Sequence, residues 1–511
     1  MMLASTPALA DGNDVAAYLR GRSASASGHM DIATADYARA LTAAPDNPVV
    51  AIRAYRSALA AGDDALALRA AIVLDRAGVA PADTALIPLA IAARANDPAT
   101  ADAAIARMKG TPLGLLVPAL TQWTAFAKRA PTSASTSTDP AARRFAVETH
   151  ALLSIAGGHV DEGMTALTAL GGAGAALDLR AAAARLLVGA GQGARARNLL
   201  APDEVALAAP ASPTLGFGVS WLLTRVAGEL ASAEPSPLSI ALTRAALRAD
   251  PTNDRARLLL ALSLSSQAAQ RAALTVLDGI APTGPFAESA ATARIVILGA
   301  AGRGAEALAV AQATAVRADS TTNDWQRYGD LLVQAGREPE AAPWFRRLAE
   351  RPGATWRDWL QYGAALDRAG RWADAEPALE RAVALGPDQS LALNYLGYAR
   401  IEHGENAAAA MRLLARAWAL EPDGDSIADS LGWAYFRSGD TARALPLVER
   451  AAVGEPTNAE IDEHLGDIYW SLGRRYEARY AWRAATVTAP ATDEARLAGK
   501  IADGTPPRAR P

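Results

Sequence analysis

Residues 356–389 read WRDWLQYGAALDRAGRWADAEPALERAVALGPDQ, and this stretch decides the fold. Its small residues, large apolar residues, glycine and proline stand at offsets that return about every 34 residues in the second half of the chain. One glycine series keeps spacings of 34, 34, 34, 35 and 34 through Gly302, Gly336, Gly370, Gly404, Gly439 and Gly473. A fixed period of this length indicates stacked copies of one supersecondary unit.

The offsets predict a pair of antiparallel helices in each period. Gly363 and Ala375 are small, so the axes of two packed helices can come to the short end of their usual separation of roughly 8–10 Å. Leu366 is one of the large residues that fill the remaining space. Gly370 ends the first helix in a conformation that other residues resist, and Pro387 stops the second helix before the next unit.

This period, with Trp or Leu, Gly, Tyr, Ala, an aromatic residue and Pro at fixed offsets, resembles the tetratricopeptide repeat. The resemblance implies an all-α fold: an α-solenoid of helix-turn-helix repeats that forms a right-handed superhelix. Each repeat would bury its apolar face only against its neighbours. It also implies a concave helical surface that holds other proteins and rarely carries out chemistry. We therefore expect a non-enzymatic protein-binding scaffold.

The register of the repeats divides the chain into segments. Residues 11–130 are predicted to form N-terminal repeat-like helices, and residues 131–140, PTSASTSTDP, a low-complexity linker. Residues 141–253 carry degenerate helical repeats, residues 254–492 the C-terminal array, and residues 493–511 a capping helix and a disordered tail. The middle segment either continues the superhelix or makes a hinge at the linker.

The first ten residues, MMLASTPALA, resemble the remnant of an export signal. Ala8-Leu9-Ala10 has the small-x-small form of a signal-peptidase site, but the basic and apolar regions of a signal peptide are missing. We therefore expect that translation starts upstream and that the mature chain begins at Asp11. The alternative is an ordinary frayed cytoplasmic terminus.

Composition excludes several classes of partner and site. The chain has 50 basic and 54 acidic residues, a net charge of −4, which gives no case for nucleic acid binding. It has no cysteine, so disulfides, thiolate metal sites and cysteine nucleophiles are absent. No run approaches the ~20 apolar residues of a transmembrane helix.

Catalytic and cofactor sites are not indicated. The five histidines are scattered, and no two have the i, i+4 spacing of a helical metal site. Asp462, Glu463, His464 and Asp467 form the nearest constellation, which we interpret as a solvated helix face. Gly-rich stretches such as residues 171–174 lack the Lys-Ser/Thr that would hold a nucleotide. We expect no catalytic residue, cofactor or metal; an enzyme would need an unrecognised site within residues 141–253.

A candidate groove follows from the repeat offsets. In the repeat, offsets 2, 5, 9 and 12 of the first helix tend to face the concave side. In the last units these offsets carry aromatic residues flanked by carboxylates, and buried aromatic side chains dominate binding hot spots. The alternative for Phe436 and Trp470 is that they pack against the neighbouring repeat. The predicted protein-binding residues are Asn394, Tyr398, Asp429, Trp433, Phe436, Glu463, Asp467 and Trp470.

Two stretches carry a closer resemblance. Residues 429–439, DSLGWAYFRSG, and 463–482, EHLGDIYWSLGRRYEARYAW, are similar to the C-terminal repeats of proteobacterial envelope tetratricopeptide proteins. That family includes the outer-membrane lipoprotein that serves as adaptor for a carboxyl-terminal processing protease. The resemblance implies an adaptor that brings a periplasmic protease and its substrates together. The lipoprotein is anchored through an acylated cysteine. This chain lacks cysteine, so the resemblance does not imply a lipid anchor on it.

Two binding roles therefore stand side by side. The first is a periplasmic adaptor for a protease or an envelope assembly machine, and the second is a cytoplasmic regulatory scaffold. Export of the chain would separate them.

Overall fold

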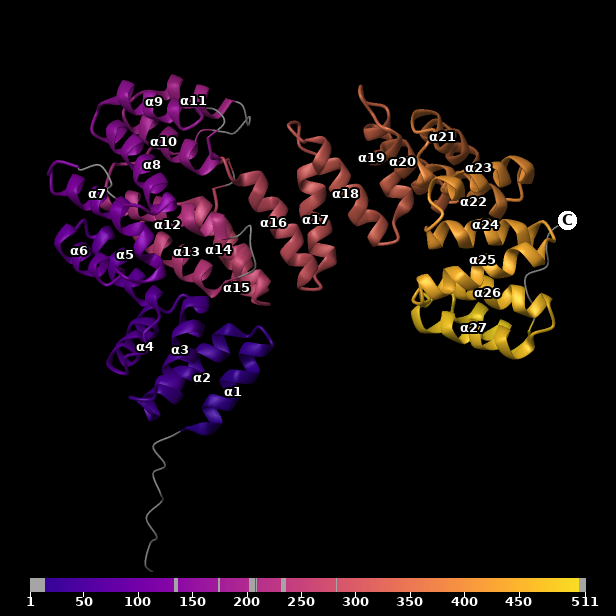
Figure 1. Ribbon diagram of the computed structural model, residues 1–511, viewed down its shortest axis with the longest axis horizontal. Coiled ribbons are helices and arrows are strands. Elements are labelled where there is room, and N and C mark those ends of the chain that lie inside the picture. Colours follow the sequence, from indigo (N-terminus) through magenta and orange to yellow (C-terminus); the bar gives the residue numbers. More distant parts are fainter. Residues whose placement is uncertain are drawn as a thin grey trace, which may run out of the picture. The chain divides into compact units, whose positions relative to one another are not determined.

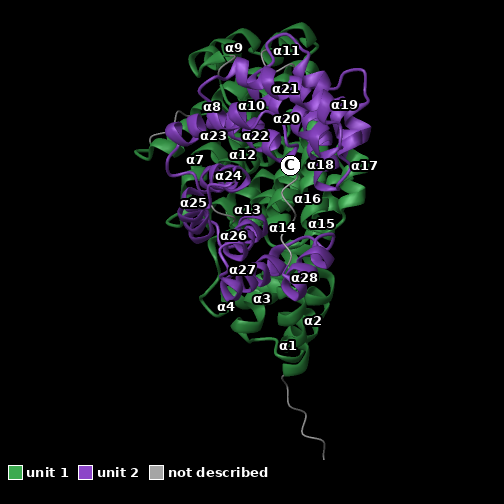
Figure 2. Cartoon of the chain, turned by 90° about the vertical axis from the view of Figure 1, so that its right-hand side faces the viewer, with its two compact units in different colours: residues 1–310 green, residues 311–511 purple. Residues whose placement is uncertain are grey.

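A computed structural model describes residues 14–132, 137–172, 175–201, 207, 209–230, 236–281 and 283–504. Within these residues the regular structure is helical, without a β-strand (Figure 1). The chain divides into two compact units, residues 1–310 and 311–511, coloured separately in Figure 2. The expected all-α solenoid is confirmed, while its handedness stays a prediction.

The N-terminal unit contains α1 to α16 and the beginning of α17. Two short 3-10 helices, η1 (Ala82–Ala85) and η2 (Pro112–Leu116), precede α5 and α7. The helices are α1 Val15–Ala26, α2 Met30–Ala43, α3 Pro48–Ala61, α4 Asp64–Arg76, α5 Leu86–Arg94, α6 Pro98–Ala106, α7 Val117–Ala127, α8 Pro140–Ala156, α9 Val160–Ala169, α10 Leu177–Gly189, α11 Gly193–Leu200, α12 Leu215–Leu230, α13 Pro237–Ala249, α14 Asp254–Ser266, α15 Gln270–Leu277, α16 Ala287–Ala300 and α17 Gly304–Ala315.

The C-terminal unit follows within α17 and consists of five helical hairpins and a final helix. Its helices are α18 Thr322–Gln334, α19 Glu338–Ala349, α20 Trp356–Arg368, α21 Trp372–Leu385, α22 Ser390–Glu402, α23 Ala407–Leu420, α24 Asp425–Arg437, α25 Thr441–Gly454, α26 Ala459–Ser471, α27 Arg475–Thr488 and α28 Glu494–Asp503. Figure 1 shows α24 to α27 as successive layers.

Close packing in each C-terminal hairpin explains the small residue at the middle of the first helix. A Cβ added to Gly363 of α20 would lie 2.7 Å from side-chain atoms of Leu379 on α21. The same substitution at Gly432 or Gly466 would meet Val448 at 2.6 Å or Trp482 at 2.4 Å. A larger side chain would therefore force the two helices of a hairpin apart.

Helix ends follow local sequence signals. Gly370, which follows α20, has φ of +72°, a conformation that glycine adopts at little cost. At the other end of α20, Thr355 and Asp358 form a capping box, in which each side chain bonds the backbone N–H of the other residue. These signals fix where each helix begins and ends, and hence which side chains of a repeat share a face.

The middle of the chain packs back onto the N-terminal helices. α8 packs against α7 across residues 131–140, α12 packs against α5 and α7, and α13 packs against α3 and α5. These helices lie in one compact unit on both sides of the linker. The division into units falls within α17, not at residue 254 where the repeat register begins.

Several predicted segments cannot be compared with the structure. The proposed signal remnant, residues 1–10, and the tail at 505–511 lie outside the described residues, as do residues 133–136 of the linker and 173–174 of the Gly-rich stretch. The last helix, α28, packs against α27.

Candidate protein-binding groove

A groove runs along the first helices of the last repeats. One hollow, of about 410 Å³, is lined by residues of α22, α24 and α26 with the end of α20. A second, of about 610 Å³, is lined by α22, α24, α26 and α28. Because the hollows have Tyr398, Glu402, Asn458 and Glu460 in common, they form one continuous surface within the C-terminal unit.

Helical spacing brings the lining residues together. Asn394, Tyr398 and Glu402 stand four residues apart on α22, so they share one face of that helix. Asp429 and Trp433 do the same on α24. Successive first helices contact one another, which places these faces next to each other along the groove.

Tyr398 bridges two repeats at the centre of the groove. Its hydroxyl donates a hydrogen bond to a carboxylate oxygen of Glu460 at the start of α26. Burial and the negative charge of Glu460 both raise the pKa of Tyr398, so the phenol stays protonated and keeps donating. The glutamate is thereby held at the groove surface, where it is exposed.

Trp433, His464 and Asp429 form a buried cluster beneath this surface. The rings of Trp433 and His464 stack with their centroids 3.9 Å apart and 12° between their planes. His464 Nδ1 donates to Asp429 Oδ2 at 2.9 Å, and Trp433 Nε1 donates to Glu402 Oε1 at 2.7 Å. Burial opposes the charged imidazolium, but the neighbouring Asp429 carboxylate prevails and the pKa of His464 is raised.

α28 covers the predicted groove residues Glu463 and Asp467. Lys500 Nζ lies 2.6 Å from Glu463 Oε1 and 2.6 Å from Asp467 Oδ2, and Trp482 Nε1 donates to Asp467 Oδ1 at 3.0 Å. Arg496 also bonds Glu463. Asp467 is only 1% exposed, so the structure corrects the expectation that its carboxylate faces the groove: it is enclosed by the chain's own C-terminal helix.

Phe436 and Trp470 are half-buried and take part in packing. Phe436 packs against two buried clusters, one formed by α22, α23 and α24 and the other by α24, α25, α26 and α27. Trp470 lies against Trp482, with ring centroids 5.5 Å apart, and fills the space beside Gly504, where an added Cβ would come within 1.7 Å of the indole ring. Phe436 therefore packs across repeats, as the packing alternative proposes, whereas Trp470 packs against the second helix of its own hairpin and the residue that follows α28.

Sequence reasoning also mistook the constellation around His464 for a solvated helix face. Asp462 and His464 are 8% and 6% exposed, and burial raises the pKa of Asp462 to about 6. The stack on Trp433 and the ion pair with Asp429 bury the imidazole, because α24 packs directly against α26. Among the described residues, no group of three or more His, Cys, Asp or Glu side chains could hold a metal ion.

Two residues that the sequence analysis did not single out dominate the open part of the groove. Glu402 accepts from Trp433 and pairs with Arg437 at 3.1 Å, and Glu460 accepts from Tyr398. Glu402 follows Tyr398 by one helical turn, a signal that could have identified it. Asn394 lines the same hollow, and its buried Oδ1 has no hydrogen-bond partner among the described residues.

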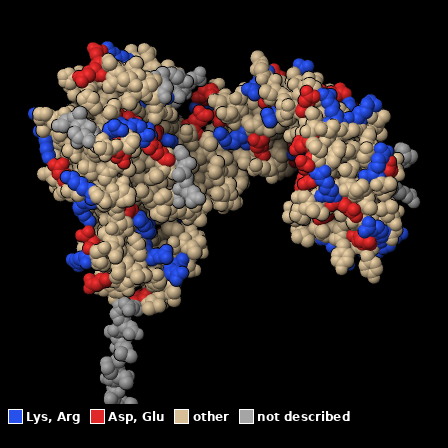
Figure 3. Space-filling model, viewed as in Figure 1, with Lys and Arg blue, Asp and Glu red and all other residues tan. Residues whose placement is uncertain are grey.

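The groove lining is acidic. Its residues include seven carboxylates, of which Asp429 and Asp467 are buried, and four Lys or Arg side chains. Acidic and basic side chains are interspersed over the face of the molecule shown in Figure 3.

Comparison with protein families identifies two stretches of this unit. Residues 356–401 and residues 430–494 each match a tetratricopeptide repeat family model. The first covers α20, α21 and nearly all of α22, and the second covers α25, α26 and α27 with most of α24. No curated protein matches the chain.

Solved structures with similar folds are also repeat proteins. A tetratricopeptide repeat protein from Parabacteroides merdae is 14% identical, covering 48% of this chain and 96% of its own with a TM-score of 0.43. A thermophilic repeat protein from Thermus thermophilus is 21% identical, covering 36% and 98% with a TM-score of 0.32. YrrB, described as having an unusual peptide-binding site, is 19% identical, covering 33% and 86% with a TM-score of 0.27.

The 34-residue period, the hairpins with a small residue at the helix contact and the matching family models agree with one another. The chain carries tetratricopeptide repeats in its C-terminal unit.

Proposed function

We propose that the C-terminal repeats bind a cationic segment of another protein in the acidic groove. The carboxylates of Glu402 and Glu460 are the observation that carries the proposal. Trp433 and Tyr398 fix one oxygen of each, and both glutamates are exposed on the groove lining. Carboxylates held in this way are prepared for charge-assisted hydrogen bonds from Arg or Lys.

Contacts of α28 support this choice of partner chemistry. Arg496 and Lys500, four residues apart on α28, engage Glu463 and Asp467 at one end of the groove. An incoming segment with similarly spaced basic residues would find Glu402 and Glu460 beside them.

The role that fits such a groove is that of a scaffold or adaptor. Tetratricopeptide repeats indicate protein binding, and we propose that the chain recruits partners and does not transform them. Across the described residues, no helix combines the length and apolar character that a membrane crossing requires.

We further propose that this adaptor works in the bacterial envelope, where a periplasmic processing protease and its substrates are the candidate partners. The support is the likeness of residues 429–439 and 463–482 to envelope repeat proteins and the small-x-small motif at Ala8–Ala10. A cytoplasmic regulatory scaffold is the second candidate. Mass spectrometry of the mature chain separates them: a first residue of Asp11 supports export, whereas a retained Met1 contradicts it.

Affinity purification from envelope extracts tests the groove. Glu402→Lys together with Glu460→Lys reverses its charge without removing an apolar side chain, and Glu405→Lys is the matched control. Glu405 is exposed and lies outside the groove lining. We expect the double variant to lose partners that the wild type and the control retain. Equal recovery by all three proteins would contradict the proposal.

A further inference from the structure

A separate cavity lies within the N-terminal unit, and the proposed groove shares no residue with it. It encloses about 220 Å³ and is lined by α10, α12 and the connections that precede α14 and α16. This is less than the ~300–1,000 Å³ usual for drug-sized ligands, so it has room for a single ring and a short polar group.

Three aromatic side chains form the apolar part of the wall. Phe217 and Trp221 from α12 are each 4% exposed, and Phe286, which precedes α16, is 8% exposed. Phe217 is held in place by Trp123, with ring centroids 5.9 Å apart and planes at 69°. Rigid aromatic walls of this kind favour a flat apolar ring, because ring pairs gain energy from offset or edge-to-face contact.

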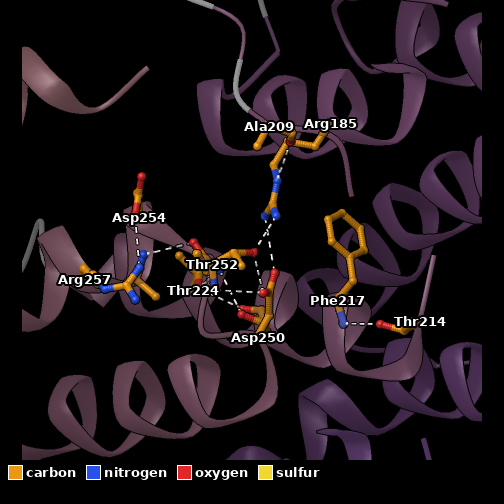
Figure 4. Close-up of polar contacts among 12 residues, drawn as sticks. Arg185, Ala209, Thr214, Phe217, Thr224, Asp250, Thr252, Asp254 and Arg257 are labelled. Atoms are coloured by element: carbon orange, nitrogen blue, oxygen red, sulfur yellow. Dashed lines mark hydrogen bonds and ion pairs between the residues drawn. The ribbon is translucent and has the colours of Figure 1, made fainter. Parts of the chain in front are cut away.

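A polar network forms the opposite part of the wall, as Figure 4 shows. Arg185 donates to Asp250 Oδ2 at 3.3 Å, to Thr252 Oγ1 at 2.8 Å and to the carbonyl oxygen of Ala209 at 3.4 Å. Each nitrogen of this guanidinium therefore has a partner within the protein. The hydrogen-bonding capacity of Arg185 is therefore satisfied without a ligand.

The remaining carboxylates of the lining are paired as well. Asp254 accepts from Arg257 at 3.0 Å and from the backbone N–H of Ala281 at 3.3 Å. Asp178 lies 2.8 Å from Arg255 Nε. A cationic ligand would have to compete with an arginine for each of these carboxylates.

Arg255, in contrast, has hydrogen-bonding capacity to spare. Its Nε lies 2.8 Å from Asp178 Oδ1, an ion pair that a bound carboxylate would have to share, and no hydrogen bond joins its terminal nitrogens to the described residues. The guanidinium carbon lies 5.8 Å from the centre of the Phe286 ring. The indole N–H of Trp221 also lacks an acceptor in the described part of the chain. Both groups can only donate, so their complement is an acceptor.

The geometry points to a binding site for a small aromatic carboxylate. Its ring lies among Phe217, Trp221 and Phe286, and its carboxylate forms a bidentate ion pair with the terminal nitrogens of Arg255. The same chemistry occurs in a free aryl acid and in the C-terminal phenylalanine of a peptide.

Calorimetric titration of the full-length chain with phenylacetate tests the site. We expect saturable one-to-one binding. Phenylacetamide, which has the same ring without the charge, should bind roughly 10- to 100-fold more weakly, the loss of a charge-assisted hydrogen bond. Phenethylamine, which carries the opposite charge, should not bind. Absence of phenylacetate binding, or equal binding of the acid and the amide, would overturn the assignment.

Two variants locate the binding. Arg255→Lys keeps the positive charge but loses the planar fork, and it should weaken phenylacetate binding by about tenfold. Ala281→Trp fills the cavity from an exposed loop position and should abolish binding. Circular dichroism checks that each variant is folded. Because the two positions are tested in separate proteins, one folded variant is enough to test the site. If a folded variant of either kind binds phenylacetate as the wild type does, the ligand binds elsewhere and the assignment is contradicted.

A peptide arm separates the two sources of the carboxylate. Acetyl-Ala-Ala-Phe with a free C-terminus and its C-terminal amide are titrated alongside phenylacetate. Binding of the free peptide but not of the amide assigns the site to chain termini, and binding of phenylacetate alone assigns it to free aryl acids. Either result supports an aryl carboxylate site, whereas binding of the amide peptide as strongly as the free peptide contradicts it.

Discussion

At the scale of single residues, the account rests on which side chains lie on the groove surface and which support that surface from beneath. Tyr398, Glu402 and Glu460 present a fixed polar surface, while Asp429, Trp433 and His464 support it from beneath. A change in the supporting cluster should therefore act first on stability, whereas a change in the exposed glutamates should act on binding.

Gly363 tests the helix contact within a hairpin. Replacing glycine by alanine inside a helix ordinarily stabilises by about 1 kcal/mol, but a Cβ at Gly363 would meet Leu379 at 2.7 Å. We expect Gly363→Ala to destabilise by about 1–3 kcal/mol, the usual cost of overpacking. Gly499→Ala on α28 is the control, since nothing lies within 4 Å of its added Cβ, and it should stabilise.

Urea unfolding followed by tryptophan fluorescence measures both variants. Nine of the eleven tryptophans lie at or beyond Trp325, so the signal reports mainly on the C-terminal unit. A stabilised Gly363→Ala protein would show that the hairpin is less tightly packed than described.

His464 makes the stability of the same unit depend on pH. Its pKa is raised in the folded chain, so the ion pair with Asp429 contributes fully below the ordinary histidine pKa of about 6.5 and is lost as pH rises through the folded value. We expect the difference in unfolding free energy between wild type and His464→Gln to be larger at pH 6 than at pH 9. In an Asp429→Asn background this pH dependence should shrink, and an undiminished dependence would assign it to another group.

At the scale of elements, α28 closes the array through one buried cation. Lys500 lies between Glu463 and Asp467, and removing it leaves the enclosed Asp467 carboxylate without its ion-pair partner, while Arg496 still pairs with Glu463. Because an uncompensated buried charge is costly, Lys500→Met should destabilise the unit by about 3–5 kcal/mol. Asp467→Asn combined with Lys500→Met should recover part of that loss in the same urea titrations. Additive effects of the two substitutions would mean that the residues are not coupled.

The repeat signal predicts some elements well and leaves others open. Where glycine and small residues recur, as at Gly363 and Gly370, hairpins and their ends follow from the sequence because each position has one steric role. The packing of α12 and α13 onto α3, α5 and α7 does not, since the degenerate repeats carry no period that specifies a distant contact.

The sequence also predicts only part of the groove lining. The spacing of Asn394 and Tyr398 places both on its lining, as the helix period requires. The burial of Asp467 depends on Lys500 of α28, a residue beyond the last repeat, so the offsets within a repeat could not reveal it.

At the scale of the whole molecule, the two units offer different kinds of surface. The C-terminal unit has an acidic groove suited to a polypeptide, and the N-terminal unit has a small cavity with aromatic walls. Charge reversal at Glu402 and Glu460 should therefore leave phenylacetate binding unchanged, and Ala281→Trp should leave partner recovery unchanged.

The central claim is that a cationic segment of another protein occupies the groove. Site-specific photocrosslinking tests it most directly, with benzoylphenylalanine placed at Ala459, which lines the groove, or at Glu405, which does not. The account predicts a crosslinked partner at position 459 alone, with the attached segment rich in Arg and Lys. Equal crosslinking at both positions, or an acidic segment attached at 459, would contradict it.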